Sequence, residues 1–538
     1  MRYDEVLPHL TSGGDPELTM TTTRTPRPRL ALTRRRFLGH LGAVGGSSLV
    51  MTALTSWDLM AGPAGTRPEL SGRPRKAKVL VLGAGVSGLA LGYELSRHGY
   101  DFHILEARER VGGLVWTVRG GTTHTEIGGE RQQCMWDAGQ WFNAGAWRIP
   151  YTHTGVLNYC KELGVPLEIF VNEADASYFY YEGAAAGSLV SRRVRLREVK
   201  ADIVGQVNEL LVKAIDQGSL DLPLTAEDQE RLVRFLMAQG YLDASDRRYK
   251  AFENRGPGDP YQLSALLEAG FGNRIRSISP REGTAAAPMF HPIGGMDQIP
   301  KAFARAIGPH RITFNAEVHS VRQDDHAATV AYRDTKTGRT HSLSADYVVI
   351  CLPLSIVAGF DCQLSPETMA AVRATNHSNS AKMGLAMKRR FWEEDDQIFG
   401  GHLYSNLPIG EFSYPSTGYF SRKGVLLGLY TNGAVGDLID KPVVERVEHV
   451  LTHSSKVHPQ IRQEFESAYG VWWQKVEYSR GGFATAPPAR RTQLSKVENR
   501  LLIGSAATAP YSEPDWQEGA VAAAWQALTS LHESAMRG

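Results

Sequence analysis

The arginine best suited to bind an anionic substrate is Arg148, which follows the small-residue run Ala144-Gly145-Ala146 and precedes Ile149-Pro150. A guanidinium can hold a carboxylate through two parallel N–H···O hydrogen bonds. Burying that guanidinium without its anion costs about 2 to 5 kcal/mol, or roughly 30-fold to several-thousand-fold in selectivity. Arg148 therefore predicts a carboxylate-bearing small molecule, provided that it faces a pocket. The alternative is an arginine in a surface or interdomain salt bridge.

A glycine-rich motif lies about forty residues before this arginine. Its three glycines are Gly83, Gly85 and Gly88. The apolar run 78–82 precedes them, a predicted helix over 89–98 follows, and a second predicted strand, 102–105, ends at Glu106. Such glycines let the backbone approach a pyrophosphate at the helix N-terminus, and the acid would accept hydrogen bonds from ribose hydroxyls. This order predicts a dinucleotide-binding βαβ unit rather than a glycine-rich turn without a ligand.

The next residues indicate which dinucleotide is bound. Arg110, Gly112 and Gly113 resemble the Arg-x-Gly-Gly-Arg element of the amine oxidase and glutathione-reductase-like flavoproteins. That resemblance implies FAD, with the loop wrapping its pyrophosphate. Leu114 departs from the element, because the family usually has a second arginine there, and Ser505 stands where an acid that contacts FAD is usual. Each departure could remove a charged hydrogen bond worth roughly 1.5 to 3 kcal/mol, and the two are opposite in charge.

Three motifs resemble the substrate side of the same family. The turn around Arg148 is similar to the Gly-Ala-x-Arg-[Ile/Leu]-Pro turn of the flavin-dependent L-amino acid oxidases. Lys382 matches the lysine that holds a water against flavin N5, and Tyr430 matches a tyrosine whose hydroxyl also binds the carboxylate. A solvated lysine and a core tyrosine are the plain alternatives for these two positions.

The resemblance also implies residues for the pocket wall and for the cofactor. Phe483 belongs to the stretch 473–483, which matches a strand that lines the substrate side chain. Trp516 would pack over the substrate, and its loop would pass under the flavin. The backbone of Val318 would meet the adenine. Asp515, before that tryptophan, could favour a polar or cationic substrate side chain.

The implied reaction is FAD-dependent oxidative deamination of an L-amino acid to a 2-oxo acid, ammonia and hydrogen peroxide, with dioxygen as the acceptor. Lys382 and Arg148 would be its catalytic residues. The alternatives are an amino acid 2-monooxygenase, an amine oxidase or dehydrogenase, and a binding module that has lost its flavin. No general base is assured, although His124, His153 and His291 lie near motifs in the sequence.

Non-covalent FAD is expected, because the last of the four cysteines is Cys362, far from the C-terminal region where monoamine oxidases attach flavin. The cysteine spacing indicates neither a metal cluster nor a disulfide scaffold. A net charge of +2 without a long basic block beyond the N-terminus argues against nucleic acid. We expect a homodimer, although the sequence does not determine the oligomeric state.

The expected fold is α/β plus α: a Rossmann-like, glutathione-reductase-like FAD-binding domain, a mixed-sheet substrate domain and a helical insertion. The FAD-binding domain is predicted over 73–150, 285–355 and 480–538, the substrate domain over 151–190 and 356–479, and the helical insertion over 190–284. An amphipathic pattern at 196–217 and a capping residue at Thr225 indicate helices in the insertion.

The N-terminal segment 1–64 has the composition of an export signal. Residues 18–57 contain no Asp or Glu, and 33–38 reads Thr-Arg-Arg-Arg-Phe-Leu, which looks like a twin-arginine signal. This predicts a periplasmic or extracellular protein of a bacterium. A disordered basic tail on a cytoplasmic protein is the alternative. Four glycines weaken the following stretch as a stable membrane span.

Overall fold

The computed structural model describes residues 66–72, 77–218, 225–252, 259–271, 288–433, 436–510 and 516–537. All of them belong to the unit Trp57–Gly538. The predicted signal segment 1–64 and Asp515 lie outside the described residues. Across the described ranges, no helix is long and apolar enough to cross a membrane.

The predicted βαβ unit is present within a five-stranded parallel sheet of order β12-β2-β1-β16-β25. Its strands are Ile312–Thr313, Asp101–Leu105, Lys78–Leu82, Tyr347–Ile350 and Leu501–Ile503. The helix α2 (Val86–Arg97) begins three residues before the predicted start, directly after the glycine turn. A continuous run of buried residues in β1 fits a parallel strand that is covered on both faces.

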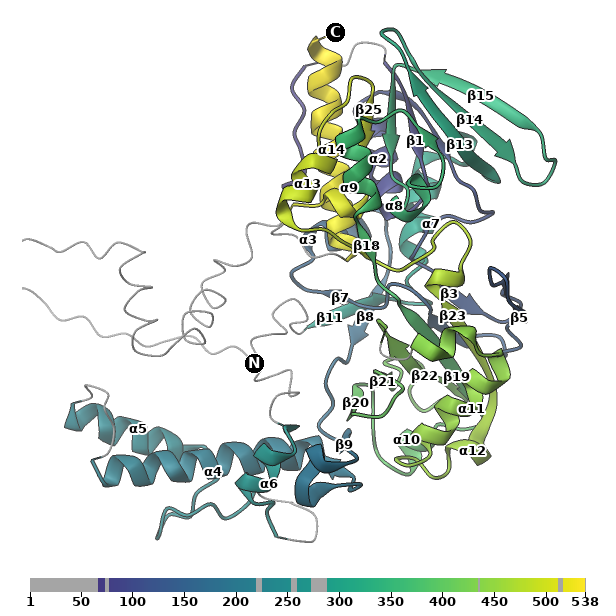
Figure 1. The fold of residues 1–538 in the computed structure, drawn as a ribbon. Helices are drawn as coiled ribbons and strands as arrows, with labels where there is room; N and C mark the ends of the chain where they lie inside the picture. The colour runs from purple at the N-terminus through teal and green to yellow at the C-terminus, as the bar shows by residue number, and fades with distance from the viewer. Residues whose placement is uncertain are drawn as a thin grey trace, which may run out of the picture. The chain divides into compact units, whose positions relative to one another are not determined.

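Alternate residues of β1 face two different layers of the core. Val79 and Val81 pack with α2, with α7 (Gln298–Ile307) and with α14 (Gln517–Arg537). Leu80 and Leu82 pack against a four-stranded sheet, β15-β14-β13-β17, and against short helices. The strands of that sheet are Ala316–Gln323 (β13), Ala328–Asp334 (β14), Thr340–Ala345 (β15) and Asp361–Cys362 (β17). Figure 1 shows both layers beside the parallel sheet.

A seven-stranded mixed sheet, β10-β9-β20-β21-β22-β19-β23, carries the predicted lysine and tyrosine. Its strands are Val194–Arg195, Tyr178–Tyr180, His402–Ser405, Phe412–Ser413, Gly424–Thr431, Ala381–Met387 and Phe465–Trp472. The strand β19 is buried throughout and pairs antiparallel with β22 and β23 on its two sides. Lys382 of β19 therefore lies opposite Tyr430 of β22 in the register.

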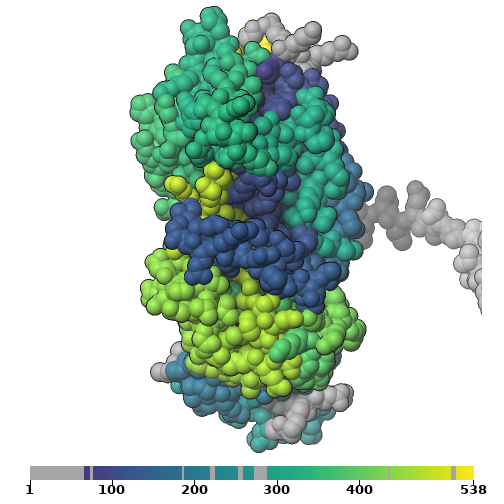
Figure 2. All heavy atoms as spheres, turned by 90° about the vertical axis from the view of Figure 1, so that its right-hand side faces the viewer, coloured from purple at the N-terminus to yellow at the C-terminus, as the bar shows by residue number. Residues whose placement is uncertain are grey.

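Short two-stranded elements lead the chain from the parallel sheet to the Arg148 turn. They are β3 (Thr117–Arg119) with β6 (Trp141–Asn143), and β4 (Thr123–Thr125) with β5 (Arg131–Gln133). Figure 2 shows this dark blue part of the chain at the surface, between teal and yellow-green parts. Directly after the turn, β7 (Ile149–Pro150) joins β11 (Met289–Pro292) and β8 (Leu167–Phe170) in a three-stranded sheet.

The helices expected between 190 and 284 are present in the described part of that range. They are α4 (Leu196–Asp216), α5 (Ala226–Ala238) and α6 (Leu263–Glu268). The Thr225 hydroxyl caps α5 by accepting a hydrogen bond from the Asp228 N–H, as predicted. The further α-helices of the described residues are α3 (Thr154–Glu162), α8 (Leu354–Val357), α9 (Pro366–Arg373), α10 (Phe391–Glu394), α11 (Val443–Ser454), α12 (Ile461–Glu464) and α13 (Pro488–Leu494).

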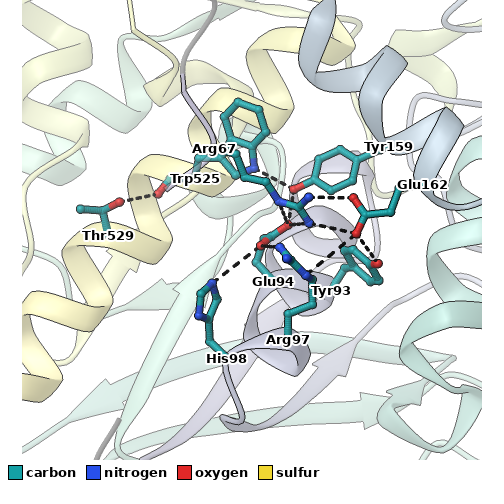
Figure 3. Close-up of polar contacts among 9 residues, drawn as sticks. All are labelled: Arg67, Tyr93, Glu94, Arg97, His98, Tyr159, Glu162, Trp525 and Thr529. Atoms are coloured by element: carbon teal, nitrogen blue, oxygen red, sulfur yellow. Dashed lines mark hydrogen bonds and ion pairs between the residues drawn. The ribbon is translucent and has the colours of Figure 1, made fainter. Parts of the chain in front are cut away.

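A polar network around one buried carboxylate joins the segment 66–72 to the helices beside the parallel sheet (Figure 3). The fully buried Glu94 of α2 lies 2.6 Å from the Arg67 guanidinium and 3.0 Å from that of Arg97. It also accepts a 2.5 Å hydrogen bond from the Tyr159 hydroxyl, which in turn accepts one from the Trp525 indole at 2.7 Å. Arg67 also lies 2.7 Å from Glu162, and we call these residues the Glu94 network.

Candidate active site

A cavity of about 480 Å³ extends from the glycine turn of the parallel sheet to the Arg148 turn. Most of the site residues that we predicted from the sequence line it. They are Gly83, Gly85, Glu106, Gly112, Gly113, Arg148, Val318, Lys382, Tyr430, Phe483, Ser505 and Trp516. Segments that are far apart in the chain thus line one cavity. Gly88 and Arg110 are not among its lining residues.

The glycine turn has the form that a dinucleotide requires. Gly85 is the N-cap of α2, and a Cβ built on it would meet no atom within 4 Å, so the backbone there borders open space. Gly83 has a φ of +98°, which other residues rarely adopt. Both oxygens of the buried Glu106 carboxylate accept backbone N–H groups, from Ala84 at 2.8 Å and from Arg108 at 2.9 Å. These residues fit the pyrophosphate and ribose of a bound FAD.

Gly88 and Arg110 do not line the cavity themselves but contact residues that do. A Cβ on Gly88 would lie 2.0 Å from the Gly83 carbonyl oxygen, so this glycine permits the helix to pack on the turn. The Arg110 guanidinium donates to the Gly113 carbonyl at 3.0 Å and lies over the Trp116 ring. Burial, together with the charge of Arg108, lowers the pKa of Arg110 to about 9. In this geometry Arg110 supports the loop that ends at Gly113, and its contact with FAD stays a prediction.

The two positions that depart from the family pattern have local roles. The Ser505 hydroxyl caps the 3₁₀ turn η7 (Ala506–Thr508) by accepting a hydrogen bond from the Ala507 N–H at 3.3 Å. The Leu114 carbonyl oxygen lies against Gly145, where a Cβ would approach it to 1.6 Å. A larger residue at 145 would therefore push the Arg148 turn away from the parallel-sheet domain.

The Arg148 guanidinium is buried, with 7% of the residue exposed, and Arg148 lines the part of the cavity that its own turn forms. Its Nη1 lies 3.2 Å from His402 Nε2, which is also 3.2 Å from Asn172 Oδ1, and 3.7 Å from an oxygen of Glu411. Its central carbon lies 4.8 Å from the ring centre of Trp147 and 5.7 Å from that of Trp516. We call Arg148, His402 and Glu411 the arginine centre. Neither His402 nor Glu411 was predicted, and neither lines the cavity.

Lys382 joins the mixed sheet to the Arg148 turn. Its buried Nζ donates to the Gly145 carbonyl at 2.6 Å and lies 4.4 Å from the ring centre of Tyr430. Burial, together with the charge of Arg148 and against an opposing effect of Glu411, lowers the pKa of Lys382 to about 7. The solvated-lysine alternative is excluded, and the side chain is poised to change charge near neutral pH.

The remaining wall of this end is aromatic, with Tyr430, Phe483 and Trp516 beside Trp147. The expected strand over 473–483 is wrong. The strand β23 ends at Trp472, and the chain then forms the 3₁₀ turn η6 (Trp473–Lys475) and a loop with positive φ at Tyr478, Arg480 and Gly481. Left-handed residues cannot continue a strand, so Phe483 reaches the cavity from a loop.

The three histidines considered as bases do not line the cavity. Burial lowers the pKa of His153 to about 4 and that of His291 to about 4, so both are neutral at physiological pH. His124 is hydrogen-bonded to the Tyr469 hydroxyl at 2.7 Å. Their positions give no support to a role in proton transfer at this cavity.

Comparison with known proteins establishes the family to which the fold and the cavity belong. Residues 86–527 match the model of the flavin containing amine oxidoreductases, so this chain belongs to that family. The family implies a flavin cofactor, which agrees with the fit of the glycine turn and Glu106.

Individual relatives and solved structures are similar to this chain over most of its length. The chain is 27% identical over 439 residues to an L-amino-acid oxidase of Crotalus adamanteus, covering 78% of this chain and 80% of that protein. It also resembles the structure of putrescine oxidase bound to putrescine, with a TM-score of 0.58, 18% identity and coverage of 85% and 98%. Cyclohexylamine oxidase from Brevibacterium oxydans IH-35A gives a TM-score of 0.57 at 17% identity, with coverage of 85% and 99%. At these identities, the two structures show only the shared fold.

Proposed function

We propose that the protein catalyses FAD-dependent oxidative deamination of L-amino acids to 2-oxo acids, ammonia and hydrogen peroxide. The observation that carries this proposal is the buried Arg148 guanidinium in the wall of the same cavity as the glycine turn. A buried cation in a pocket favours a ligand with a matching anion, and a simple amine offers none. The relatives named L-amino-acid oxidase support the same substrate class.

Each residue at this end of the cavity has a distinct proposed task. Arg148 holds the substrate carboxylate, and the Tyr430 hydroxyl assists it. The aromatic surfaces of Phe483 and Trp516 exclude water and orient the side chain. Lys382 supplies a positive charge beside the reacting atoms when it is protonated. Bound flavin supplies the two-electron acceptor, which dioxygen reoxidises.

The decisive experiment compares amino acids with their decarboxylated amines. The holoprotein is mixed anaerobically with each of the twenty L-amino acids and with matched amines, such as L-phenylalanine and 2-phenylethylamine, and flavin bleaching is followed. We expect at least one amino acid to reduce the flavin at least 30-fold more efficiently than its amine. Equal efficiency for both compounds would support an amine oxidase or dehydrogenase instead.

A second measurement separates the oxidase from an amino acid 2-monooxygenase. With dioxygen present, the oxidase forms one hydrogen peroxide and one ammonia for each amino acid consumed, and carbon dioxide arises only where that peroxide attacks the 2-oxo acid, which added catalase prevents. Carbon dioxide in place of peroxide would assign the protein to the monooxygenases.

We also propose that FAD is held without a covalent bond. The Cys351 thiol is the one cysteine among the described lining residues, and it lies by the glycine turn, where it contacts Ser87. Burial raises the pKa of Cys351 to about 12, which leaves it a poor nucleophile. Acid precipitation should release all of the yellow colour into the supernatant, and colour retained in the pellet would contradict the proposal.

We also propose that the protein is exported through the twin-arginine route and that it assembles as a homodimer. Export is tested by expressing the full chain and a variant with Arg34, Arg35 and Arg36 replaced by lysine, and by assaying the periplasm and medium. Light scattering of the purified protein tests the dimer.

A further inference from the structure

We propose that Glu518 is a positioning residue, which holds the Arg148 turn and Trp516 at the spacing that an amino acid substrate requires. The inference rests on the proposed amino acid oxidation, because it concerns how the substrate carboxylate is held. Glu518 is buried, with 1% of the residue exposed, and it is not among the described residues that line the cavity. It therefore acts through its neighbours, without touching the substrate.

The helix α3 begins shortly after Arg148 and receives its N-terminal cap from Glu518. Within the described part of the chain, the N-cap residue His153 gives α3 no side-chain hydrogen bond, and the first turn holds no acidic residue. The first N–H groups of a helix have no partner inside the helix, so they need one from elsewhere. One Glu518 oxygen accepts from the Gly155 N–H at 2.7 Å, and the other accepts from the Val156 N–H at 2.8 Å. A negative charge is also what a helix N-terminus favours.

The helices α3 and α14 approach each other closely at Gly155, which lets Glu518 reach across (Figure 1). A Cβ on Gly155 would lie 2.9 Å from a Glu518 oxygen and 2.9 Å from the Trp525 ring, both on α14. Glycine therefore permits the contact. In a close-packed interior, a side chain at this position would press the two helices apart.

Each of these helices begins beside a residue that lines the cavity. The Trp516 carbonyl accepts the Ala520 N–H at 3.3 Å, so Trp516 is tied to the first turn of α14. The chain from Arg148 to α3 is short, and within it the His153 N–H donates to the Pro150 carbonyl at 3.0 Å. The ring centre of Trp516 lies 5.7 Å from the central guanidinium carbon of Arg148 and 5.3 Å from the ring centre of His153. By joining α3 to α14, Glu518 fixes the Arg148 turn against Trp516.

Arg148 and Trp516 act on different parts of the substrate in the proposed function. Arg148 binds the carboxylate, whereas Trp516 packs against the rest of the molecule. A shift of α3 against α14 changes their spacing, and a displacement of about 1 Å in a binding group can cost about 100-fold in rate. A matched amine has no carboxylate, so it loses only what Trp516 contributes. The ratio of kcat/KM for the amino acid to that for its amine therefore reports the placement of Arg148.

The test uses Glu518→Gln, which keeps the size of the side chain but leaves only one oxygen to accept from the two N–H groups. We measure kcat and KM for the best L-amino acid and for its matched amine. We expect the ratio of the two kcat/KM values to fall about tenfold relative to wild type, mainly through a higher KM for the amino acid.

A second variant, Gly155→Ala, disturbs the same contact from the side of α3. It should lower the ratio as well, because its Cβ meets the Glu518 carboxylate and the Trp525 ring. In the double variant the two losses should not multiply, because both act on one contact between the helices.

A matched control is Glu94→Gln. Glu94 is also fully buried and also contacts α3, where its carboxylate accepts from the Tyr159 hydroxyl at 2.5 Å, farther along the helix. This variant should lose stability but keep the wild-type ratio. Thermal unfolding of each variant verifies that the comparison is made on folded protein.

The outcomes separate this inference from the proposed function. If wild type shows no preference for the amino acid over its amine, the proposed function is refuted, and the role of Glu518 falls with it. If wild type has the preference but the ratio is unchanged in both Glu518→Gln and Gly155→Ala, the role of Glu518 alone is refuted. An equal loss for amino acid and amine leaves the ratio unchanged and counts as the same result. If Glu518→Gln does not fold, Gly155→Ala decides the question.

Discussion

The Glu94 network and the arginine centre both place an arginine against a carboxylate, but the acid is the buried partner in the network and the arginine is the buried partner in the centre. In the network, Arg67 lies 2.6 Å from Glu94 and 2.7 Å from Glu162, and no member of this set lines the cavity. In the centre, Glu411 lies 3.7 Å from Arg148, His402 also contacts the guanidinium, and Arg148 lines the cavity. Close, multiple contacts suit a group that stabilises the fold. A looser pair beside a cavity suits a group that must also hold a ligand.

Replacing Arg148 with methionine gives the largest expected effect on activity. We expect kcat/KM for the best amino acid to fall by roughly 30-fold to several thousand-fold, because the carboxylate loses its buried partner. Steady-state kinetics with L-phenylalanine and 2-phenylethylamine would measure it, and the amine should be affected far less. An equal loss for both compounds would show that Arg148 does not act on the carboxylate. The arginine centre would then not differ in function from the Glu94 network.

The matching change in the Glu94 network should act on stability instead. Glu94→Gln removes a fully buried carboxylate that contacts two part-exposed arginines, so we expect the free energy of unfolding to fall by about 2 kcal/mol. Chemical denaturation would measure this loss. The KM for the amino acid should stay within twofold of wild type at a temperature where the variant is folded. Glu162→Gln, at a half-exposed partner of Arg67, should cost less than about 1 kcal/mol.

Lys382→Met should slow flavin reoxidation about 100-fold, because it removes a positive charge preorganised near the reacting atoms. Stopped-flow mixing of reduced enzyme with dioxygen would measure the rate. Binding of the amino acid should weaken much less, because Arg148 remains in place. Unchanged reoxidation would show that Lys382 only supports the Arg148 turn through the Gly145 carbonyl.

The smallest expected effect is a pH dependence of the same step. Burial lowers the pKa of Lys382 to about 7, so the side chain is protonated below this pH and neutral above it. If its charge assists reoxidation, the rate falls as pH rises through about 7. The inflection should be absent from Lys382→Met. A wild-type rate that is flat between pH 5.5 and 8.5 would contradict the charged role.

The local patterns of the chain were sufficient for the βαβ unit and for several site residues. The apolar run 78–82, the glycines and the acid at 106 each follow from requirements within about thirty residues, and the structure confirms the elements that they predicted. The stretch 473–483 was predicted incorrectly, because its strand pattern came from resemblance, while left-handed residues such as Tyr478 leave no sign in an apolar pattern.

The sequence by itself determined the dinucleotide turn, the family pattern around Arg148 and Lys382, and the class of fold, because these depend on backbone geometry and short-range spacing. Only the tertiary structure decided that the guanidinium meets His402 and Glu411, more than 250 residues away along the chain. It likewise decided that Lys382 bonds to the Arg148 turn and that Glu94 belongs to a network without a cavity. Charges interact through space, so their partners and their burial are known only once distant segments are packed together.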